Sequence, residues 1–333
     1  MKKYILFLLL FFSFHITIYN QIIKGTVMDQ NTKSPITYAS VYFNTTFVQT
    51  YTDQNGYFTL DISKYISMPL TVSALGYYST TINDFQTDKP LLIYLSPKVF
   101  ELKEVVVTAK NNPKARRRNL KLFKNVFLGT TSNASECQIT NEKDIIIINN
   151  TDNDTIKAFS SKPILIDNKA LGYKISYYLD RFEFYKQDST FLIDGNIIFN
   201  EDLMTEKAQK NKFERRRKIV YLGSRMHFFR ELWENNLDAT GFTIRDSANV
   251  QINVDDLVIQ NDNPLTKVKD KYLSYPGKLR IFYNRNLPTD ISFLKDNVYF
   301  EKCGYFDGTS LKWEGEMAAQ RIADWLPFEY SVK

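Results

Sequence analysis

The segment from Gln21 to Leu95 breaks into short runs in which apolar and polar residues alternate, and this pattern most limits the fold of the chain. Turn residues separate the runs at roughly the 8–12-residue spacing of an all-β sandwich. The runs are QIIKGTVMD, YASVYFN, FVQTYT, GYFTLDI, LTVSAL, YYSTTIN and LLIYL. Because alternate side chains of a strand share one face, as Phe58 and Leu60 do, we expect seven strands with one buried face each.

The composition extends this expectation to the whole chain. A length of 333 residues with 44% hydrophobic side chains allows two domains with substantial cores. The 21 Tyr and 25 Phe, against 12 Gly and 10 Pro, favour strands over helical bundles. We therefore predict a mainly β protein, with a sandwich over residues 21–109, a linker over 110–114 and a β-rich α+β domain over 115–333.

Residues 1–20 have the pattern of a signal peptide. The start MKK is followed by the apolar run YILFLLLFFSF, which gives a positive n-region and then an h-region. Cleavage before Gln21 is expected, but Ile18 and Asn20 fit a cleavage site poorly, so an uncleaved anchor is the alternative. In either case we expect the chain to be exported.

Charge and cysteine content limit the partners. Without Lys2 and Lys3 the formal net charge falls from +6 to +4, with 41 basic against 37 acidic residues, which is too mild for a nucleic-acid partner. The two cysteines, Cys137 and Cys303, fall in the second half. An oxidising compartment permits a disulfide between them, and two buried thiols are the alternative.

The stretch TDQNGYF, residues 52–58, has two interpretations. Asp53 and Asn55 could begin a calcium loop, or they could form a tight turn between two strands. A calcium loop of the EF type needs an oxygen ligand at its fifth position and a glutamate at its twelfth, and here those positions hold Tyr57 and Lys64. Asp53 and Gly56 fit a turn, so we predict no metal ligand here.

The front segment also resembles a known family. The matching positions are Gly25, Pro35, Ala39, Val41, Thr52, Asp53, Gly56, Phe58, Gly76, Tyr77 and Leu95. From IKGTVMD to EVVVTA the sequence resembles the carboxypeptidase-regulatory-like domain, a seven-stranded, transthyretin-like Greek-key sandwich. Such domains often stand at the periplasmic N-terminus of TonB-dependent receptors and in other Gram-negative envelope proteins. The resemblance therefore implies a periplasmic or outer-membrane-associated protein.

The activities that accompany this domain elsewhere do not fit the chain. A zinc carboxypeptidase needs two histidine ligands and two glutamates, one of them catalytic. The chain has two histidines, and since His15 lies in the signal segment, His227 alone remains. A receptor barrel of about 22 strands, at about ten residues per strand plus loops, needs more chain than follows the linker.

The second domain combines strands with three predicted helical regions, near 114–128, 203–236 and 316–325. Leu120, Phe123 and Phe127 have the spacing of an amphipathic helix, Ser224 is a natural N-cap, and Pro327 ends the last region.

Strand runs return between Cys137 and Asn200, with Asp194-Gly195 interpreted as a turn. The long run YKISYYLDRFEFY changes phase around Asp180, which indicates a bulge. Most of residues 115–330 resembles a region that follows this domain in exported bacterial proteins without assigned activity.

Basic residues cluster in two places. Arg116–Arg118 lie near the start of the first predicted helix, where a solvated face beside a linker is expected and contact with an acidic partner or anionic lipid is the alternative. The denser cluster combines basic and aromatic side chains: Arg215, Arg216, Arg217, Arg225, His227 and Arg230. It has two interpretations, a patch for an anionic glycan, lipid or peptide, or the solvated face of helices whose Phe and Trp are core.

Motifs for catalysis are missing from the sequence. It contains no GxSxG, Walker loop, dinucleotide fingerprint, CxxC or HExxH. We therefore predict no catalytic residue, metal or cofactor. Two functions remain open: a non-catalytic envelope protein that binds a protein partner or glycan, and a hydrolase of envelope polymers that uses an unrecognised carboxylate site.

Overall fold

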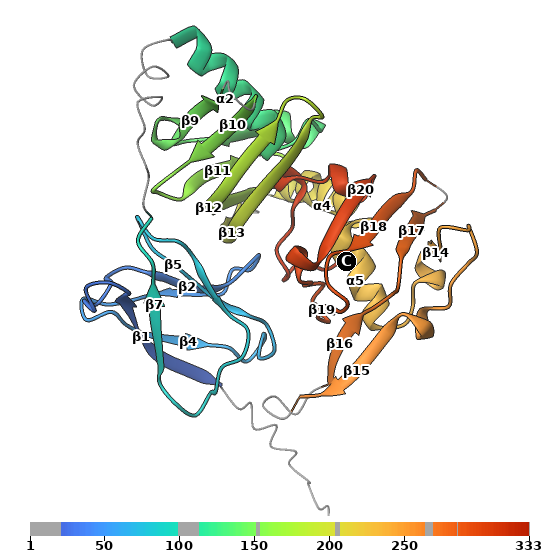
Figure 1. The fold of residues 1–333 in the computed structure, drawn as a ribbon, viewed down its shortest axis with the longest axis horizontal. Coiled ribbons are helices and arrows are strands. Elements are labelled where there is room, and N and C mark those ends of the chain that lie inside the picture. The colour runs from blue at the N-terminus through green and yellow to red at the C-terminus, as the bar shows by residue number, and fades with distance from the viewer. Residues whose placement is uncertain are drawn as a thin grey trace, which may run out of the picture.

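A computed structural model describes residues 21–98, 113–150, 154–203, 207–263, 269–284 and 286–332. The protein is mainly β, as predicted, and has three parts (Figure 1): an N-terminal sandwich, a central sheet covered by a helix, and a C-terminal lobe with two further sheets. The predicted signal peptide, the linker residues 110–112 and the EVVVTA segment lie outside the described residues. Within the described ranges no helix is both long and apolar enough to cross a membrane.

The N-terminal sandwich contains all seven predicted strands. They are β1 (Ile22–Asp29), β2 (Ser40–Phe43), β3 (Gln49–Tyr51), β4 (Tyr57–Asp61), β5 (Leu70–Ser73), β6 (Thr80–Ile82) and β7 (Leu91–Leu95). One sheet has the order β4-β1-β7 and the other β3-β2-β5-β6. The alternating side chains Ile23 and Val27 of β1, and Phe58 and Leu60 of β4, meet in the core between the sheets. The period-two pattern therefore corresponds to one buried face per strand.

The TDQNGYF stretch is a turn between β3 and β4. The Asp53 carboxylate accepts hydrogen bonds from the backbone N–H groups of Asn55 at 2.8 Å and Tyr57 at 2.9 Å. Gly56 adopts a φ of +72°, which glycine tolerates best. The turn interpretation is confirmed. In the same domain, the Tyr77 hydroxyl donates to Asp29 at 2.7 Å, so another of the family positions ties the loop between β5 and β6 to the end of β1.

Replacing Gly56 with alanine should destabilise the sandwich. The positive φ is retained by the surrounding turn, and an added Cβ would lie 2.6 Å from the Val27 carbonyl oxygen. We expect Gly56→Ala to lower the free energy of unfolding by about 2 kcal/mol, measured by urea denaturation. Gly76→Ala is the matched control, because Gly76 has a φ of +82° but no heavy atom within 4 Å of an added Cβ, and only the backbone cost of about 1 kcal/mol should remain. A calcium-dependent rise in melting temperature that Asp53→Ala abolishes would contradict the turn assignment.

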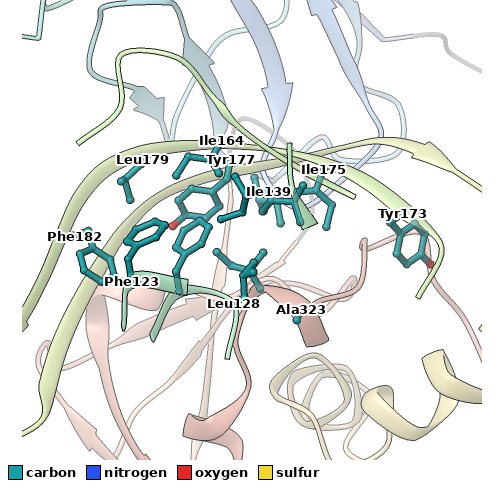
Figure 2. Close-up of a cluster of buried hydrophobic side chains, with 14 of the residues drawn as sticks. Phe123, Leu128, Ile139, Ile164, Tyr173, Ile175, Tyr177, Leu179, Phe182 and Ala323 are labelled. Carbon is teal, nitrogen blue, oxygen red and sulfur yellow. The ribbon is translucent and has the colours of Figure 1, made fainter. Parts of the chain in front are cut away.

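The central sheet is built from strands of the second predicted domain. Its elements are α2 (Pro113–Phe127), α3 (Ser132–Ser135), the 3-10 turn η1 (Glu142–Asp144), β8 (Cys137–Ile139), β9 (Ile146–Asn150), β10 (Thr155–Phe159), β11 (Ile164–Asn168), β12 (Tyr173–Tyr185) and β13 (Thr190–Asp202). The strand order is β8-β11-β12-β10-β9, and β13 pairs with β12. Helix α2 packs its aromatic face on this sheet: Phe123 lies 4.8 Å from Phe182, and Phe127 lies 5.0 Å from Tyr177, between ring centroids. Figure 2 shows Phe123, Tyr177 and Phe182 in this core.

The long β12–β13 hairpin is bulged where the sequence changes phase. Its register shifts between Leu179 and Arg181, so the predicted bulge at Asp180 is confirmed. The turn predicted at Asp194-Gly195 is wrong, because both residues lie inside β13 and the hairpin turns at residues 186–189. Gly195 stands opposite Leu179, beside the bulge, where an added Cβ would lie 2.3 Å from the Tyr178 carbonyl oxygen. This glycine therefore serves a close backbone approach and not a turn.

The C-terminal lobe packs the second of its two helices against two small sheets, while the first contacts the central sheet. Its helices and 3-10 turns are α4 (Lys207–Tyr221), α5 (Arg225–Trp233), η2 (Asp238–Thr240), η3 (Val254–Asp256), η4 (Gly308–Ser310), η5 (Met317–Ala319) and η6 (Ile322–Asp324). Its strands are β14 (Phe242–Arg245), β15 (Val258–Asp262), β16 (Lys269–Leu273), β17 (Lys278–Tyr283), β18 (Thr289–Phe293), β19 (Val298–Phe300) and β20 (Leu311–Gly315). The sheet orders are β14-β17-β18-β20 and β15-β16-β19. Ser224 caps α5 as predicted, since its hydroxyl accepts a hydrogen bond from the His227 N–H at 3.0 Å.

The helix predicted near 316–325 is wrong. The segment forms the two 3-10 turns η5 and η6, separated by the extended residues Gln320 and Arg321. Contacts to other parts of the chain replace the helical hydrogen bonds: the Ala323 N–H donates to the Leu128 carbonyl at 3.2 Å, and the Gln320 amide donates to the Val220 carbonyl at 3.2 Å. Tertiary contacts therefore override the local helical pattern.

Candidate functional site

An open cleft of about 1090 Å³ lies where the three parts of the chain meet. All three parts contribute to its walls: Thr71, Ser79 and Thr81 come from the sandwich, Asp180, Leu192 and Asp194 from the β12–β13 hairpin, and Tyr272, Tyr299, Trp313 and Trp325 from the C-terminal lobe. Clefts between domains are common sites for ligands. We therefore take this cleft as the candidate functional site.

A loop of the sandwich fixes one end of the cleft. The Thr45 N–H donates to the Ile197 carbonyl at 2.9 Å, and the Ile197 N–H donates to the Asn44 side-chain oxygen at 2.8 Å. The same loop contacts the C-terminal segment, where the Phe328 N–H donates to the Thr45 carbonyl at 2.9 Å. The loop thus joins the sandwich both to β13 and to the end of the chain.

A largely buried ion pair fixes the sandwich at the bulge. Lys98 Nζ lies 3.2 Å from Asp180 Oδ1, and the two side chains are only 6% and 15% exposed. Lys98 also donates to the Leu179 carbonyl at 2.7 Å, and Asp180 accepts from the Ser79 N–H at 3.3 Å. The bulge therefore presents a carboxylate that holds the neighbouring domain in place.

The cleft is lined by six aspartates and three basic residues. The aspartates are Asp84, Asp180, Asp194, Asp270, Asp307 and Asp324, and the basic residues are Arg181, Arg225 and Lys295. Asp194 is open to the water in the cleft, but the protein around it limits its hydration, and this burial, together with the charge of Asp180, raises its pKa.

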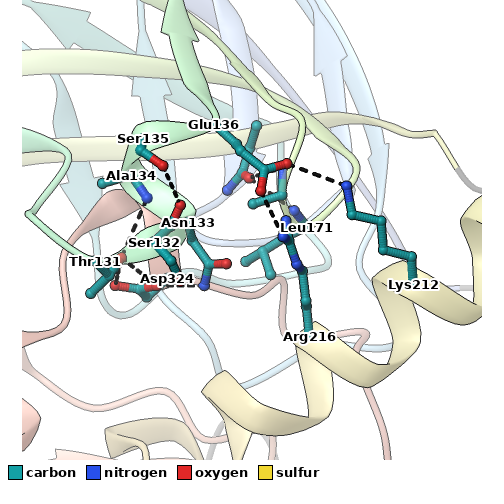
Figure 3. Close-up of polar contacts among 12 residues, drawn as sticks. Thr131, Ser132, Asn133, Ala134, Ser135, Glu136, Leu171, Lys212, Arg216 and Asp324 are labelled. Atoms are coloured by element: carbon teal, nitrogen blue, oxygen red, sulfur yellow. Dashed lines mark hydrogen bonds and ion pairs between the residues drawn. The ribbon is translucent and has the colours of Figure 1, made fainter.

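Asp324, at the base of the cleft, also has a raised pKa. Burial is the main cause, and hydrogen bonds that Asp324 accepts from Asn133 at 2.8 Å and from Thr131 at 3.1 Å oppose it (Figure 3). These bonds tie η6 to α3, which indicates a structural role for this carboxylate.

The first half of the predicted basic patch is mostly engaged inside the protein. Arg217 is 2% exposed and forms a bidentate pair with Asp202, at 2.7 and 2.9 Å. Arg216 pairs with Glu136 at 2.6 Å, beside Lys212 (Figure 3). Only Arg215 of this triplet is fully exposed. The interpretation of the triplet as a solvated helix face is therefore wrong for Arg217.

The second half of the patch is also internal. His227 is 4% exposed, and burial, with a smaller effect of Arg230, lowers its pKa to about 4. Arg230 donates to the carbonyls of Cys303, Phe328 and Tyr330 at 2.7–3.0 Å. The interpretation as part of a solvated helix face is therefore wrong for His227 as well.

The basic residues do not form one surface. Arg215 and Arg217 line a separate pocket of about 470 Å³, whereas Arg225 lines the cleft. The six residues therefore do not form the single partner site that the sequence suggested. Of these six, Arg225 alone is among the residues that line the cleft.

Arg116, in the other predicted basic cluster, likewise forms hydrogen bonds inside the protein. Its guanidinium donates to the carbonyls of Ile145 at 3.2 Å and Glu142 at 3.0 Å, while Arg117 and Arg118 are exposed. The solvated-face interpretation therefore describes Arg117 and Arg118, and Arg116 instead anchors α2 to the sheet.

The cysteines and the acidic groups give no metal centre in the described part of the chain. No group of three His, Cys, Asp or Glu side chains there could hold a metal ion. Cys137 and Cys303 are both free, Cys137 packed against the central core and Cys303 against the sandwich core. Burial raises the pKa of each thiol to about 12, which favours the protonated form at neutral pH. The disulfide is therefore absent between these two residues, and the thiols of the alternative interpretation are half-buried and not fully buried.

Comparison with known families identifies the front of the chain. Residues 23–107 match the model of the CarboxypepD_reg-like domain. The N-terminal sandwich is therefore a carboxypeptidase-regulatory-like domain, as its turn, its strand spacing and its family positions predicted. No curated protein matches the chain.

Most of the cleft residues carry no recognisable signal in the sequence. The sequence marks Asp180 only by a change of phase, and Asp194 only as part of a predicted turn. Trp313 and Trp325 stand in short runs near the C-terminus that resemble ordinary core segments. No spacing in the sequence links these four positions, because they meet only through the packing of three separate parts.

Proposed function

We propose that this protein is a non-catalytic cell-envelope protein that binds a glycan or a protein partner in the cleft between its three parts. The observation that carries this proposal is the size and position of the cleft, about 1090 Å³ and walled by all three parts. Such a volume exceeds the roughly 300–1,000 Å³ of typical small-molecule sites, which favours an extended ligand. The signal-like pattern of residues 1–20 and the regulatory-like domain support an exported protein, in the periplasm or associated with the outer membrane.

The state of the cleft carboxylates favours binding over catalysis. Hydrolysis by two carboxylates needs one acid and one base or nucleophile that both face the scissile bond. Asp180 is paired with Lys98, and Asp324 is held by Asn133 and Thr131. These side chains serve the packing of the three parts, and using them for chemistry would release those contacts.

One observation supports a hydrolase as the second candidate. Asp194 faces the cleft and has a raised pKa, which is the property of a general acid, and Asp180 is close enough to contribute to that shift. In this alternative Asp194 would protonate the leaving group of an envelope polymer.

A binding experiment with a blocked cleft tests the proposal. The full chain would be immobilised and exposed to envelope polysaccharide and envelope protein fractions, with Asn83→Trp as the blocking variant, because Asn83 lines the sandwich wall. We expect capture of a specific component to fall about tenfold or more, while Lys89→Trp, an exposed position outside the cleft lining, leaves it unchanged. Equal capture by the two variants would contradict a cleft site. Release of new reducing ends or peptide fragments by the unmodified protein, lost in Asp194→Asn, would favour the hydrolase.

A further inference from the structure

Arg225 is a half-buried cation without an acidic partner in the described part of the chain. It lines the cleft, and its guanidinium lies over the rings of Trp313 and Trp325, at 5.7 and 5.8 Å from their centroids. Its hydrogen bond to the Gln320 carbonyl, at 3.2 Å, is to a neutral group. No described carboxylate forms an ion pair with Arg225 within 4.0 Å. Charges that are largely withdrawn from water are normally paired, so a half-buried guanidinium without an anion is unfavourable as it stands.

The surroundings of Arg225 add to this cost. Burial, and then the nearby charge of Arg321, lower the pKa of Arg225 to about 10. Among the described residues, Arg321 itself donates to the carbonyls of Ala318 and Gln320 and lies over the ring of Phe191 at 4.2 Å. Arg225 is also the first residue of α5, where a positive charge opposes the helix dipole. Two cations and a helix N-terminus thus create a local excess of positive charge.

The neighbouring indole groups are donors without acceptors. Trp313 Nε1 and Trp325 Nε1 are buried, and neither has a hydrogen-bond acceptor within the described residues. Both tryptophans line the same cleft as Arg225. Buried donors are almost always paired in folded proteins, and an unpaired one is unfavourable. An oxyanion beside Arg225 would supply the acceptor that the guanidinium and, after a small movement, the indole groups lack.

We propose that Arg225, Trp313 and Trp325 form an anion subsite that binds the carboxylate of an acidic saccharide. This inference rests on the proposed binding function of the cleft and assigns its ligand class. A carboxylate matches the two-pronged donor geometry of a guanidinium.

The rest of the cleft selects a saccharide with isolated charges. Six aspartates against three basic residues would repel a polyanion. Carboxylates are hydrogen-bond acceptors, and the hydroxyl groups of a sugar are matching donors. Tyr272 and Tyr299, whose rings lie 5.6 Å apart and also line the cleft, add aromatic surface of the kind on which apolar sugar faces pack. The lining therefore favours a mostly neutral, hydroxyl-rich chain that carries a carboxylate at one position.

Titration of the full chain with paired saccharides tests this inference. The probes are 3′-sialyllactose and a xylotriose that carries a single glucuronate, each compared with its methyl ester, in which the one carboxylate charge is removed. Two of the chain's three tryptophans flank Arg225, so intrinsic fluorescence reports binding directly, and calorimetry gives the affinity. We expect at least one acid to bind about tenfold or more tightly than its ester, and the difference to shrink at high salt.

Variants separate the subsite from the cleft as a whole. Arg225→Gln should abolish the preference for acid over ester while leaving the weaker binding of the ester, whereas Arg118→Gln, an exposed arginine on α2, should change neither. The comparison of acid and ester in the unmodified protein does not depend on how well a variant folds.

Three results would overturn the inference. Equal binding of acid and ester would remove the anion subsite and leave the cleft as a binding site. Tighter binding of a triglutamate peptide than of either saccharide would assign the subsite to an acidic peptide and not to an acidic saccharide. Binding of none of the probes would reject the acidic saccharide, while the blocked-cleft experiment judges the proposed function separately.

Discussion

Replacing Arg217 with methionine should destabilise the protein by about 3 kcal/mol. Arg217 is 2% exposed and makes four hydrogen bonds, two to the Asp202 carboxylate and two to the carbonyls of Leu171 and Gly172, at 2.7 and 3.2 Å. Its guanidinium also lies 3.8 Å from the centroid of the Tyr173 ring. Methionine preserves much of the packing but removes all four donated hydrogen bonds and the positive charge, and losing one partner of a buried pair typically costs about 3–5 kcal/mol. Because Asp202 is 36% exposed and can regain water, we expect the lower end of that range.

Chemical denaturation of matched variants measures this effect. Arg215→Ala, two residues away on the same helix and exposed, should change the free energy of unfolding by no more than about 0.5 kcal/mol. Arg217→Lys should fall between the two, because one ammonium group can neutralise Asp202 but cannot serve four acceptors in fixed directions. Equal stability of Arg217→Met and Arg215→Ala would mean that Arg217 is not the buried anchor of α4.

The sandwich could be predicted from the sequence because its signals are local. Alternation gives each strand its buried face, and Asp53 with Gly56 specifies a turn through contacts within a few residues. The amphipathic spacing of Phe123 and Phe127 likewise predicted α2 and its buried face. In each case the residues that determine the structure are close neighbours in the chain.

The errors arose where distant contacts decide the structure. Residues 316–325 have a helical pattern, but hydrogen bonds to Leu128 and Val220 hold them in 3-10 turns. Gly195 looked like a turn residue, although its role depends on the backbone of Tyr178 in the paired strand. Arg217 and His227 looked like solvated side chains for the same reason, since the acceptors and rings that bury them come from other elements. The cleft depends on such contacts throughout, so no local pattern could locate it.

The ion pair between Lys98 and Asp180 should control how firmly the sandwich is held at the cleft. Replacing Lys98 with methionine removes the charge and the donor while keeping the length of the side chain. Asp180, whose side chain is 15% exposed, would then be a nearly buried carboxylate without its cation. We expect a loss of about 3–5 kcal/mol in the free energy of unfolding, because an unpaired buried charge is strongly unfavourable. Lys89→Met, an exposed lysine of the same domain, is the matched control and should have little effect.

A double-mutant cycle distinguishes loss of the pair from a general loss of packing. If the pair is what joins the sandwich to the bulge, Asp180→Asn should restore part of the stability lost in Lys98→Met, with a coupling energy on the order of 1–3 kcal/mol. Small-angle X-ray scattering should show a larger radius of gyration for Lys98→Met than for Lys89→Met, since the remaining contacts at Thr45 and Asn44 secure only one end of the cleft. Additive effects of the two substitutions and an unchanged radius of gyration would contradict this role. The wall that Thr71, Ser79 and Thr81 contribute to the cleft would then be positioned by the loop at Thr45 alone.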